Sequence, residues 1–366
     1  MIWLTWRQFR LQVFVAAAVV VAFAVLLAVT GPHLASLFMT SKVGSCQGGP
    51  DQCGAYADEF LKQLYEGSAL ASLSITAIGI YWLQYLLGIA LILAAPALIG
   101  VFWGAPLIAG EFEAGTHYLA WTQSITRTRW LAVKLTLTGL AAVAVTEALS
   151  LMQAWWSTPI SLAVARGACC SPMAMNQFSP VVFATHGITP VGYAAFAFAL
   201  GVTVGVVVRR PVPAMAITLA IFAAFQVAMP LWVRPQLFPP EHAITTLSSW
   251  GSVDIQAGGG TFSLIPDGFT EPEAWILSSA TAVNTAGQPV SALPAACAEA
   301  MQVAASAKAG HPDLLQCLDN NGIRVAVTDQ PAGRYWAFQW TETAIYLALA
   351  LGLAGYCFWR IVRRIS

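Results

Sequence analysis

The chain has 366 residues, of which 58% are hydrophobic and 9% are charged, and its mean hydropathy is +0.68. Lysine and arginine together number 17, as do aspartate and glutamate, so the formal net charge is zero. This composition argues against a single water-soluble core and against a basic nucleic-acid-binding surface. It predicts a chain that crosses a lipid bilayer several times.

Residues 1–11 mix aromatic and basic side chains, namely Trp3, Trp6, Arg7 and Arg10. Such a mixture is typical of a helix that lies at the level of the lipid headgroups. We therefore expect an interfacial elbow helix here. An ordinary positively charged start to the first span is the alternative interpretation.

Six stretches approach the length of about 20 apolar residues that a helix needs to cross a bilayer. We place these spans at residues 12–29, 80–102, 131–155, 191–208, 214–232 and 337–359. A secretory signal is an alternative for the first, but Gly31-Pro32 follows it without a small-x-small cleavage pattern. The expected fold class is an all-α polytopic membrane protein.

Basic residues indicate the orientation of the spans. With the N-terminus inside, they concentrate in the short cytosolic segments, at Arg7, Arg10, Arg127, Arg129, Lys134, Arg209, Arg210, Arg360, Arg363 and Arg364. The positive-inside rule then predicts that both termini are cytosolic, with residues 360–366 as an inner tail.

The outer segments are residues 30–79, 156–190 and 233–336. The first contains a helix-like stretch at 55–70. The third has strand-like stretches at 261–265 and 275–283, turn signals at 258–260 and 266–268, and a helix-like stretch at 294–308. This pattern predicts a small mixed extracellular subdomain before the last span.

All cysteines except Cys357 fall in these outer segments, where an oxidising environment permits disulfides. Cys46 with Cys53 and Cys297 with Cys317 are the favoured pairs. Because six cysteines allow 15 arrangements, and because they can also stay unpaired, the pattern does not decide the pairing. No Cys-x-x-Cys occurs and the histidines are scattered, so we expect no metal site.

Polar side chains within the spans are candidates for a transport pathway. Glu147 and Gln153 belong to the third span, and Glu342 lies near the outer end of the sixth. An acid at mid-bilayer costs about 2.5 to 3.5 kcal/mol on insertion scales, so Glu147 should face protein or water. A structural hydrogen bond to a neighbouring helix is the alternative for Glu147, and an interfacial position is the alternative for Glu342.

The inner segment at residues 103–130 is the longest cytosolic piece. It has an acidic start, a Gly-Thr break, apolar side chains and a basic end, at Glu111, Glu113, Gly115, Thr116, Leu119, Trp121, Arg127 and Arg129. Such a segment can transmit a movement of a cytosolic partner to two spans at once. A solvated pair that starts a helix is the alternative for the two glutamates.

Glu111-Phe-Glu-Ala-Gly-Thr116, Leu119-Ala-Trp-Thr-Gln-Ser124 and Arg127-Thr-Arg-Trp130 resemble the coupling segment of export-type ABC transporter permeases. Residues 1–10 resemble the elbow helix of the same family. The family usually has a basic residue before the first glutamate, where this chain has Gly110. The resemblance implies a bacterial plasma-membrane protein, a second permease copy or paralogue, and a cytosolic ABC ATP-binding subunit.

The chain contains no Gly-x-x-x-x-Gly-Lys-Ser/Thr phosphate loop, so we expect ATP and Mg to bind to the partner subunit. Motifs of an intramembrane enzyme are also absent from the sequence. A proton-coupled secondary transporter that uses Glu147 is one alternative function. A sensor or assembly protein that binds through residues 233–336 is another.

Overall fold

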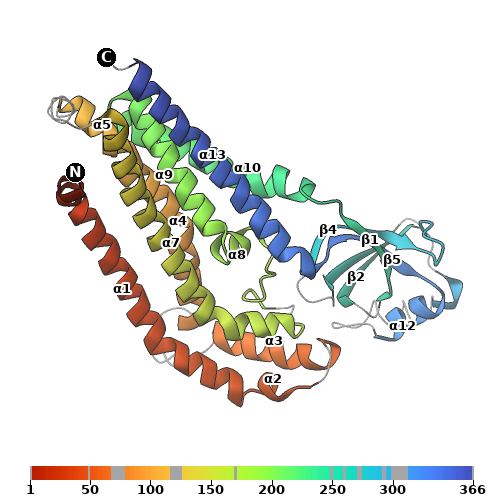
Figure 1. Ribbon diagram of the computed structural model, residues 1–366. Helices are drawn as coiled ribbons and strands as arrows, with labels where there is room; N and C mark the ends of the chain where they lie inside the picture. The colour runs from red at the N-terminus through yellow and green to blue at the C-terminus, as the bar shows by residue number, and fades with distance from the viewer. Residues whose placement is uncertain are drawn as a thin grey trace.

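The computed structural model describes residues 2–47, 50–66, 79–115, 126–168, 171–247, 250–258, 261–269, 274–290, 294–297 and 312–364. A long bundle of helices carries a smaller part with β-strands at one end, and both termini lie at the opposite end (Figure 1). In the described residues, six helices are long and apolar enough to cross a membrane. The expectation of six helices of spanning length and of a small sheet before the last one is therefore confirmed.

The first three spans belong to long helices. They are α1 (Ile2–Thr40), α4 (Ile80–Ile99), which continues through the π-helix η2 (Gly100–Gly104) into α5 (Ala105–Glu113), and α7 (Arg127–Ala165). At 1.5 Å per residue, α1 and α7 are each about 58 Å long, about twice the hydrocarbon core. Both helices therefore extend beyond the bilayer. The end of the bundle opposite the termini is called the outer end below, and the end with the termini the inner end, after the orientation that the basic residues predict.

The N-terminal segment is not a separate helix. Residues 2–11, expected as an elbow, form the first turns of α1, which runs unbroken to Thr40. The reason is local, because no glycine or proline occurs before Gly31-Pro32.

The remaining spans are α9 (Thr189–Val208), α10 (Pro211–Ala228) and α13 (Tyr335–Arg364). After α10 the chain continues through the short helices η3 (Met229–Val233) and η4 (Arg234–Gln236). Helix α9 contacts α4, α5, α7, α10 and α13. Of the residues in its most apolar stretch, 78% are buried inside the protein, against 6% in α1. Helix α9 is thus the centre of the bundle.

Three short helices lie at the outer end of the bundle, namely α2 (Lys42–Ser45), α3 (Pro50–Glu66) and α8 (Pro180–Thr185) (Figure 1). Helix α3 packs against α7 and α4, so that Phe60 and Leu61 join a core with Leu34 and Phe38 of α1. One face of the outer extensions of α1 and α7 is therefore packed against protein.

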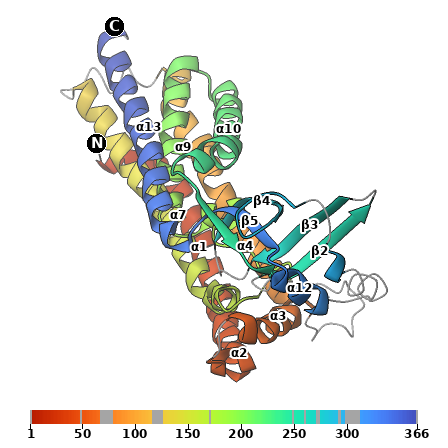
Figure 2. The ribbon, with the colours of Figure 1, turned by 90° about the vertical axis from the view of Figure 1, so that its right-hand side faces the viewer.

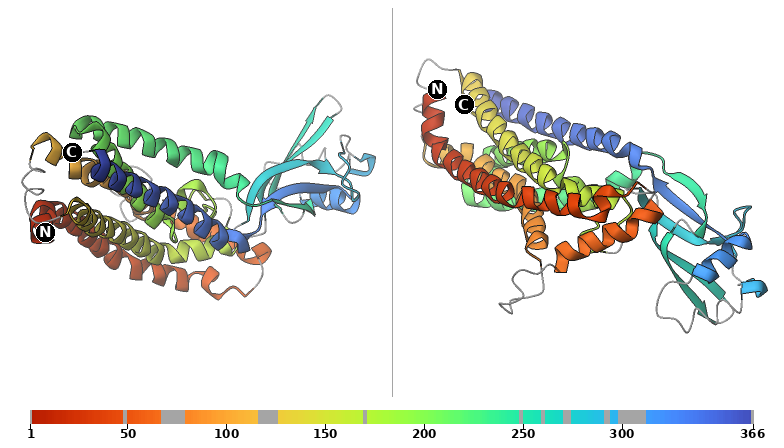
Figure 3. Two further views of the ribbon diagram at one scale, coloured as in Figure 1. Left: turned by 45° about the horizontal axis from the view of Figure 1, so that its top comes forward. Right: turned by 90° about the horizontal axis from the view of Figure 1, so that it is seen from below.

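The outer subdomain contains an antiparallel sheet in the order β1 (Glu241–Thr245), β5 (Arg324–Gln330), β4 (Trp275–Val283). A separate hairpin of β2 (Trp250–Gly258) and β3 (Thr261–Phe269) projects beside it (Figure 2). Helix α12 (Pro312–Asn320) packs its leucines against the core of the sheet. Figure 3 shows the subdomain beyond the outer end of the bundle, on the side of α13. The 3-10 helices η6 (Ala295–Cys297) and η7 (Ala332–Arg334) complete it.

Both expected strands are present, because β3 covers residues 261–265 and β4 covers residues 275–283. The turn expected at residues 266–268 is wrong, since β3 continues through it and pairs Pro266 with Val253. A two-stranded hairpin leaves one edge of each strand unpaired, which allows a proline in β3. Of the expected helix at 294–308, only Ala295–Cys297 is helical, as a short 3-10 helix, and residues 298–308 lie outside the described residues.

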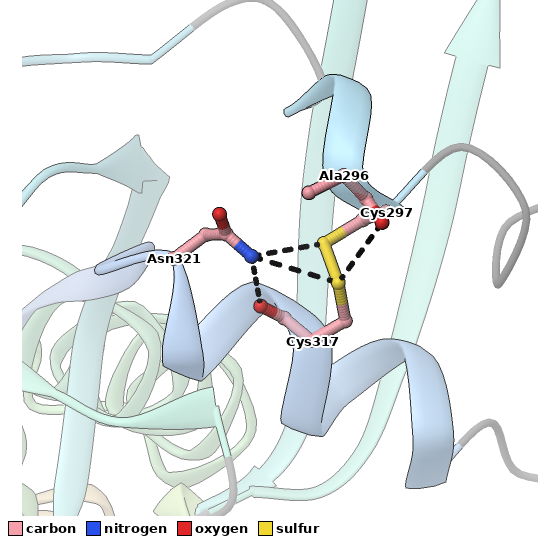
Figure 4. The surroundings of a disulfide bond; sticks show 4 residues. All are labelled: Ala296, Cys297, Cys317 and Asn321. Atoms are coloured by element: carbon pink, nitrogen blue, oxygen red, sulfur yellow. Dashed lines mark hydrogen bonds between the residues drawn. A yellow bond between two sulfur atoms is a disulfide. The ribbon is translucent and has the colours of Figure 1, made fainter.

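The structure joins Cys46 to Cys53 and Cys297 to Cys317, the two pairs that the sequence favoured. Cys169 and Cys170 lie outside the described residues. Figure 4 shows the second bond between η6 and α12, where the amide nitrogen of Asn321 donates to the Cys317 carbonyl oxygen at 2.8 Å. The half-cystine Cys297 is buried in the subdomain core with Leu247, Leu318 and Val325.

We expect the Cys297→Ser/Cys317→Ser variant to lose about 3 kcal/mol of the stability of the outer subdomain, because the bond closes a loop of 20 residues. The measurement is limited proteolysis of purified protein in detergent. Cleavage in residues 294–330 should accelerate while the spans stay intact. The Cys46→Ser/Cys53→Ser variant is the control, and equal cleavage rates in the subdomain of both variants would contradict the expectation.

Candidate functional site

The inner end of the bundle holds the part of the predicted coupling segment that the structure describes. Helix α5 ends at Glu113, and Gly115 follows with a φ of +67°, a left-handed conformation that favours glycine. Arg127 and Arg129 begin α7 after the N-cap Thr126, whose hydroxyl accepts the Arg129 N–H. Thr116, Leu119 and Trp121 lie outside the described residues.

An ion pair joins the two helices that flank this segment. The Lys134 ammonium of α7 bonds to the Glu111 carboxylate of α5, and it also lies 5.0 Å from the centre of the Trp130 ring. Lys134 is 3% exposed, whereas Glu113 is exposed on the same helix as Glu111. Glu111 therefore ties α5 to α7, while Glu113 faces the surface.

The π-helix η2 directly precedes α5 and contacts α1. The Gln12 amide nitrogen donates to the Phe102 carbonyl oxygen at 3.0 Å, and the rings of Phe9 and Trp103 meet edge to face at 4.7 Å. A π-helical turn leaves a helix with irregular hydrogen bonding and is frequent at functional sites. Arg10 is exposed, and Trp3, Trp6 and Arg7 lie in the first turns of α1.

Four glycines bring η2 and α5 into backbone contact with α9. A Cβ atom added at Gly201 would lie 2.2 Å from the Gly100 carbonyl oxygen, and one added at Gly104 would lie 2.7 Å from the Phe198 carbonyl oxygen. A Cβ at Gly205 would lie 2.5 Å from the Ala105 carbonyl oxygen. Sequence reasoning missed this crossing, although both partners carry Gly-x-x-x-Gly in an apolar helix, which is the signal for close packing.

The outer end of the bundle holds a buried ionic network. The Arg234 guanidinium of η4 donates to both carboxylate oxygens of Glu342 on α13, at 2.9 and 3.2 Å, and these side chains are 1% and 0% exposed. The Tyr193 hydroxyl of α9 donates to the same carboxylate at 2.5 Å, and the guanidinium lies 3.9 Å from the Phe183 ring centre.

This network thus connects η4, α8, α9 and α13. Sequence reasoning selected Glu342 but missed Arg234, which directly follows the fifth span. An arginine adjoining a span and an acid within another are the signal that could have found the pair.

Helix α7 presents polar side chains toward α8 and α4. The Ser150 hydroxyl donates to the Thr185 carbonyl oxygen at 2.9 Å, and Ser157 Oγ lies 3.1 Å from His186 Nε2. Burial lowers the pKa of the His186 imidazole, although a hydrogen bond to the Val182 carbonyl opposes the shift. These contacts fix α8 against the outer half of α7.

The other two pathway candidates lie on this helix. Gln153 is fully buried, and among the described residues its amide has no hydrogen-bond partner. It fills the space beside Gly88 of α4, where an added Cβ would lie 2.2 Å from Gln153 Oε1. Glu147 is partly buried, and its Oε2 has no partner among the described residues. Within the described residues, no hydrogen bond links Glu147 or Gln153 to Glu342.

A family model described as "ABC-2 membrane transporter related" matches residues 17–234. The matched part runs from α1 to η4, so it contains the glycine crossing, the inner segment and Arg234, and it ends before the outer sheet. No curated protein and no solved structure matches the chain. Because the matched residues are more than half of the chain, this multi-pass membrane protein belongs to the ABC-2 membrane transporter related family and is ABC-2 permease-like.

Proposed function

We propose that the chain is the permease subunit of an ATP-driven exporter in the bacterial plasma membrane, with both termini in the cytosol. A separate ABC ATP-binding subunit binds and hydrolyses ATP with Mg. A second permease, which is a copy or a paralogue of this chain, completes the pathway for an amphipathic substrate. Membership of the ABC-2 related family supports the transport role and the need for an ATPase partner.

The observation that carries this proposal is the mechanical connection of the inner segment. Residues 111–129 join α5 to α7, and the Glu111–Lys134 pair ties the same two helices together. Helix α5 and η2 in turn lie in backbone contact with α9, the most buried span. A force on the segment therefore reaches the second, third and fourth spans.

The residues of the segment divide into two roles. Glu111 holds α5 to α7. We assign binding of the ATPase to the other residues of the segment, namely Glu113, Thr116, Leu119, Trp121, Arg127 and Arg129. Gly115 sets the direction of the chain between them through its positive φ. The π-helix η2 is the point at which α4 and α5 change their relative direction during transport.

We expect Gly115→Val to weaken binding of the ATPase subunit about 5- to 30-fold, because a β-branched residue at this φ costs about 1 to 2 kcal/mol. Gly333→Val is the matched control. It lies at the outer end, where an added Cβ also meets nothing within 4 Å and φ is not positive. Binding is measured by titration of detergent-solubilised protein with the ATPase. Equal affinities of the two variants would contradict the docking role of this turn.

The function as a whole is tested by co-purification and reconstitution. A tagged chain should bring down an ATPase that carries a phosphate loop, and deletion of residues 112–124 should abolish the association. Transport into proteoliposomes should require ATP. Transport that persists without ATP and stops in Glu147→Gln would overturn the proposal in favour of a proton-coupled carrier.

A further inference from the structure

The turn between α9 and α10 lies at the inner end of the bundle and consists of two arginines. Arg209 and Arg210 form the whole connection between the two helices, and both side chains are exposed. Val207 and Val212 are exposed apolar side chains within two residues on either side, so the turn stays close to the hydrocarbon core. The two guanidinium groups therefore lie at the level of the lipid headgroups.

The backbone conformation of Arg209 is unfavourable for an arginine. Its φ is +59°, and among the described residues it is the one residue other than glycine with a positive φ. Glycine or asparagine would form this C-terminal turn of α9 at a lower cost. The Arg209 guanidinium also lies 5.7 Å from the centre of the Phe112 ring of α5, a contact that orients the charge. Local structure does not explain an arginine at this position, whereas a use for its charge does.

Helix α13 brings two more arginines to the same depth. Helices α9 and α13 run side by side toward the inner end (Figure 1), and Thr203 Oγ1 lies 3.2 Å from Cys357 Sγ. Arg209 follows Thr203 by six residues, and Arg363 follows Cys357 by six residues, which is about 9 Å along each helix. The side chains at this depth, called the inner arginine rim below, are Arg209, Arg210, Arg360 and Arg363.

Aromatic side chains on α13 locate the rim relative to the bilayer. Trp340 and Trp359 are both exposed, and they stand 19 positions apart on one helix. This spacing is about 28 Å, close to the thickness of about 30 Å of the hydrocarbon core. Because tryptophan is enriched at both membrane interfaces, Trp359 marks the inner interface. Arg360 and Arg363 follow it directly and belong to the headgroup layer.

The charge at the inner end is strongly positive. By sequence, residues 1–11, 103–130, 209–213 and 360–366 contain nine arginines and two acidic residues, Glu111 and Glu113. Glu111 bonds to Lys134. In the part of the chain that the structure describes, no ion pair includes an arginine of the rim. Since the inner segments have too few acids to neutralise these arginines, their counter-charges come from outside the chain.

We propose that the inner arginine rim binds the phosphate groups of anionic phospholipids in the inner leaflet. A phosphate at headgroup level accepts charge-assisted hydrogen bonds from guanidinium groups, and the lipid supplies the counter-charge. The acyl chains lie along the exposed apolar side chains that border the rim, such as Val207 and Val212. The site requires a bilayer but no ATPase, so the inference goes beyond the proposed function and does not depend on it.

The test measures lipid binding to the full-length permease in detergent by native mass spectrometry, without any ATPase. The probe is phosphatidylglycerol, and phosphatidylethanolamine with the same acyl chains is the zwitterionic control. We expect the parent to bind phosphatidylglycerol at least about fivefold more tightly, because one basic residue near an anionic membrane surface strengthens binding about fivefold.

Two variants each remove half of the rim. Arg209→Asn/Arg210→Gln should weaken phosphatidylglycerol binding about 5- to 30-fold and leave phosphatidylethanolamine binding unchanged. Asparagine tolerates a positive φ, so the turn keeps its conformation. Arg360→Gln/Arg363→Gln should give a loss of the same size.

The matched control removes two charges at the outer end of the bundle. Lys42 of α2 and Lys62 of α3 belong to this end. Lys42→Gln/Lys62→Gln should bind phosphatidylglycerol like the parent.

Equal binding of the two lipids to the parent, or unchanged phosphatidylglycerol binding in either arginine variant, would overturn the inference. An equal loss in the lysine control would do the same, because net charge and not the rim would then decide binding. Arginine variants that keep the lipid but lose the ATPase would assign the rim to that partner instead. Because lipid binding is measured without the ATPase, a failure here leaves the proposed function standing.

Discussion

Gly201→Leu should abolish the stable fold of the bundle or lower its free energy of unfolding by about 3 kcal/mol or more. The substituted Cβ would lie 2.2 Å from the Gly100 carbonyl oxygen and 2.8 Å from the Ala105 amide nitrogen, so two backbones must separate. Neither neighbour is a flexible side chain that can move away. Overpacking of a well-packed contact costs about 1 to 3 kcal/mol, and here the contact between α9 and η2 is lost as well.

The matched control is Gly352→Leu in α13, where an added Cβ meets nothing within 4 Å. Both variants make the same chemical change within a span. The measurement is size-exclusion chromatography of heated, detergent-solubilised protein, which reports the temperature at which the folded peak disappears. We expect the Gly352 variant to match the parent. Equal melting temperatures for both variants would show that the α9 crossing tolerates separation.

Glu342→Gln should destabilise the protein by about 3 to 5 kcal/mol, because it leaves the Arg234 guanidinium buried without its counter-charge. The carboxylate accepts two bonds from Arg234 and one from Tyr193, and among the described residues the remaining nitrogen Nη1 of Arg234 has no partner. The amide keeps the size of the side chain and removes its charge. The loss of stability therefore comes from the unpaired charge of Arg234 and not from a cavity.

The exposed pair between Arg334 and Glu241 is the control for this substitution. Its N–O distance is 2.6 Å, but the side chains are 30% and 56% exposed. Glu241→Gln should therefore cost about 0 to 1 kcal/mol. Both variants are compared by unfolding in mixed micelles with an increasing fraction of SDS.

The Arg234→Met/Glu342→Leu double variant separates the ion pair from the contacts around it. Replacing both charges removes the desolvation cost along with the attraction, so we expect the double variant to be more stable than Glu342→Gln. A double variant that is less stable by the sum of the two single losses would contradict this account. In that case each side chain would act through its own contacts with α8 and α9.

Hydrophobic length is a local property, so the sequence was sufficient to predict six spans and β4. The sequence favoured the pair Cys297 and Cys317 but left the pairing undecided, and the structure shows the bond. The family resemblance was read from a short local motif, and the family match over residues 17–234 supports the resemblance. For the spans and for β4, the information lies within a single element.

Contacts between elements far apart in the sequence could not be predicted from local patterns. Arg234 and Glu342 are 108 positions apart, and a pattern of apolar residues does not tell which acid a buried arginine meets. Pro266 by itself indicates a turn, but the pairing of β3 with β2 outweighs the local preference of this proline. The face of α9 that meets η2 depends on the rotation of both helices. Packing and the cost of burying a charge determine these arrangements, and both act only when the whole bundle has assembled.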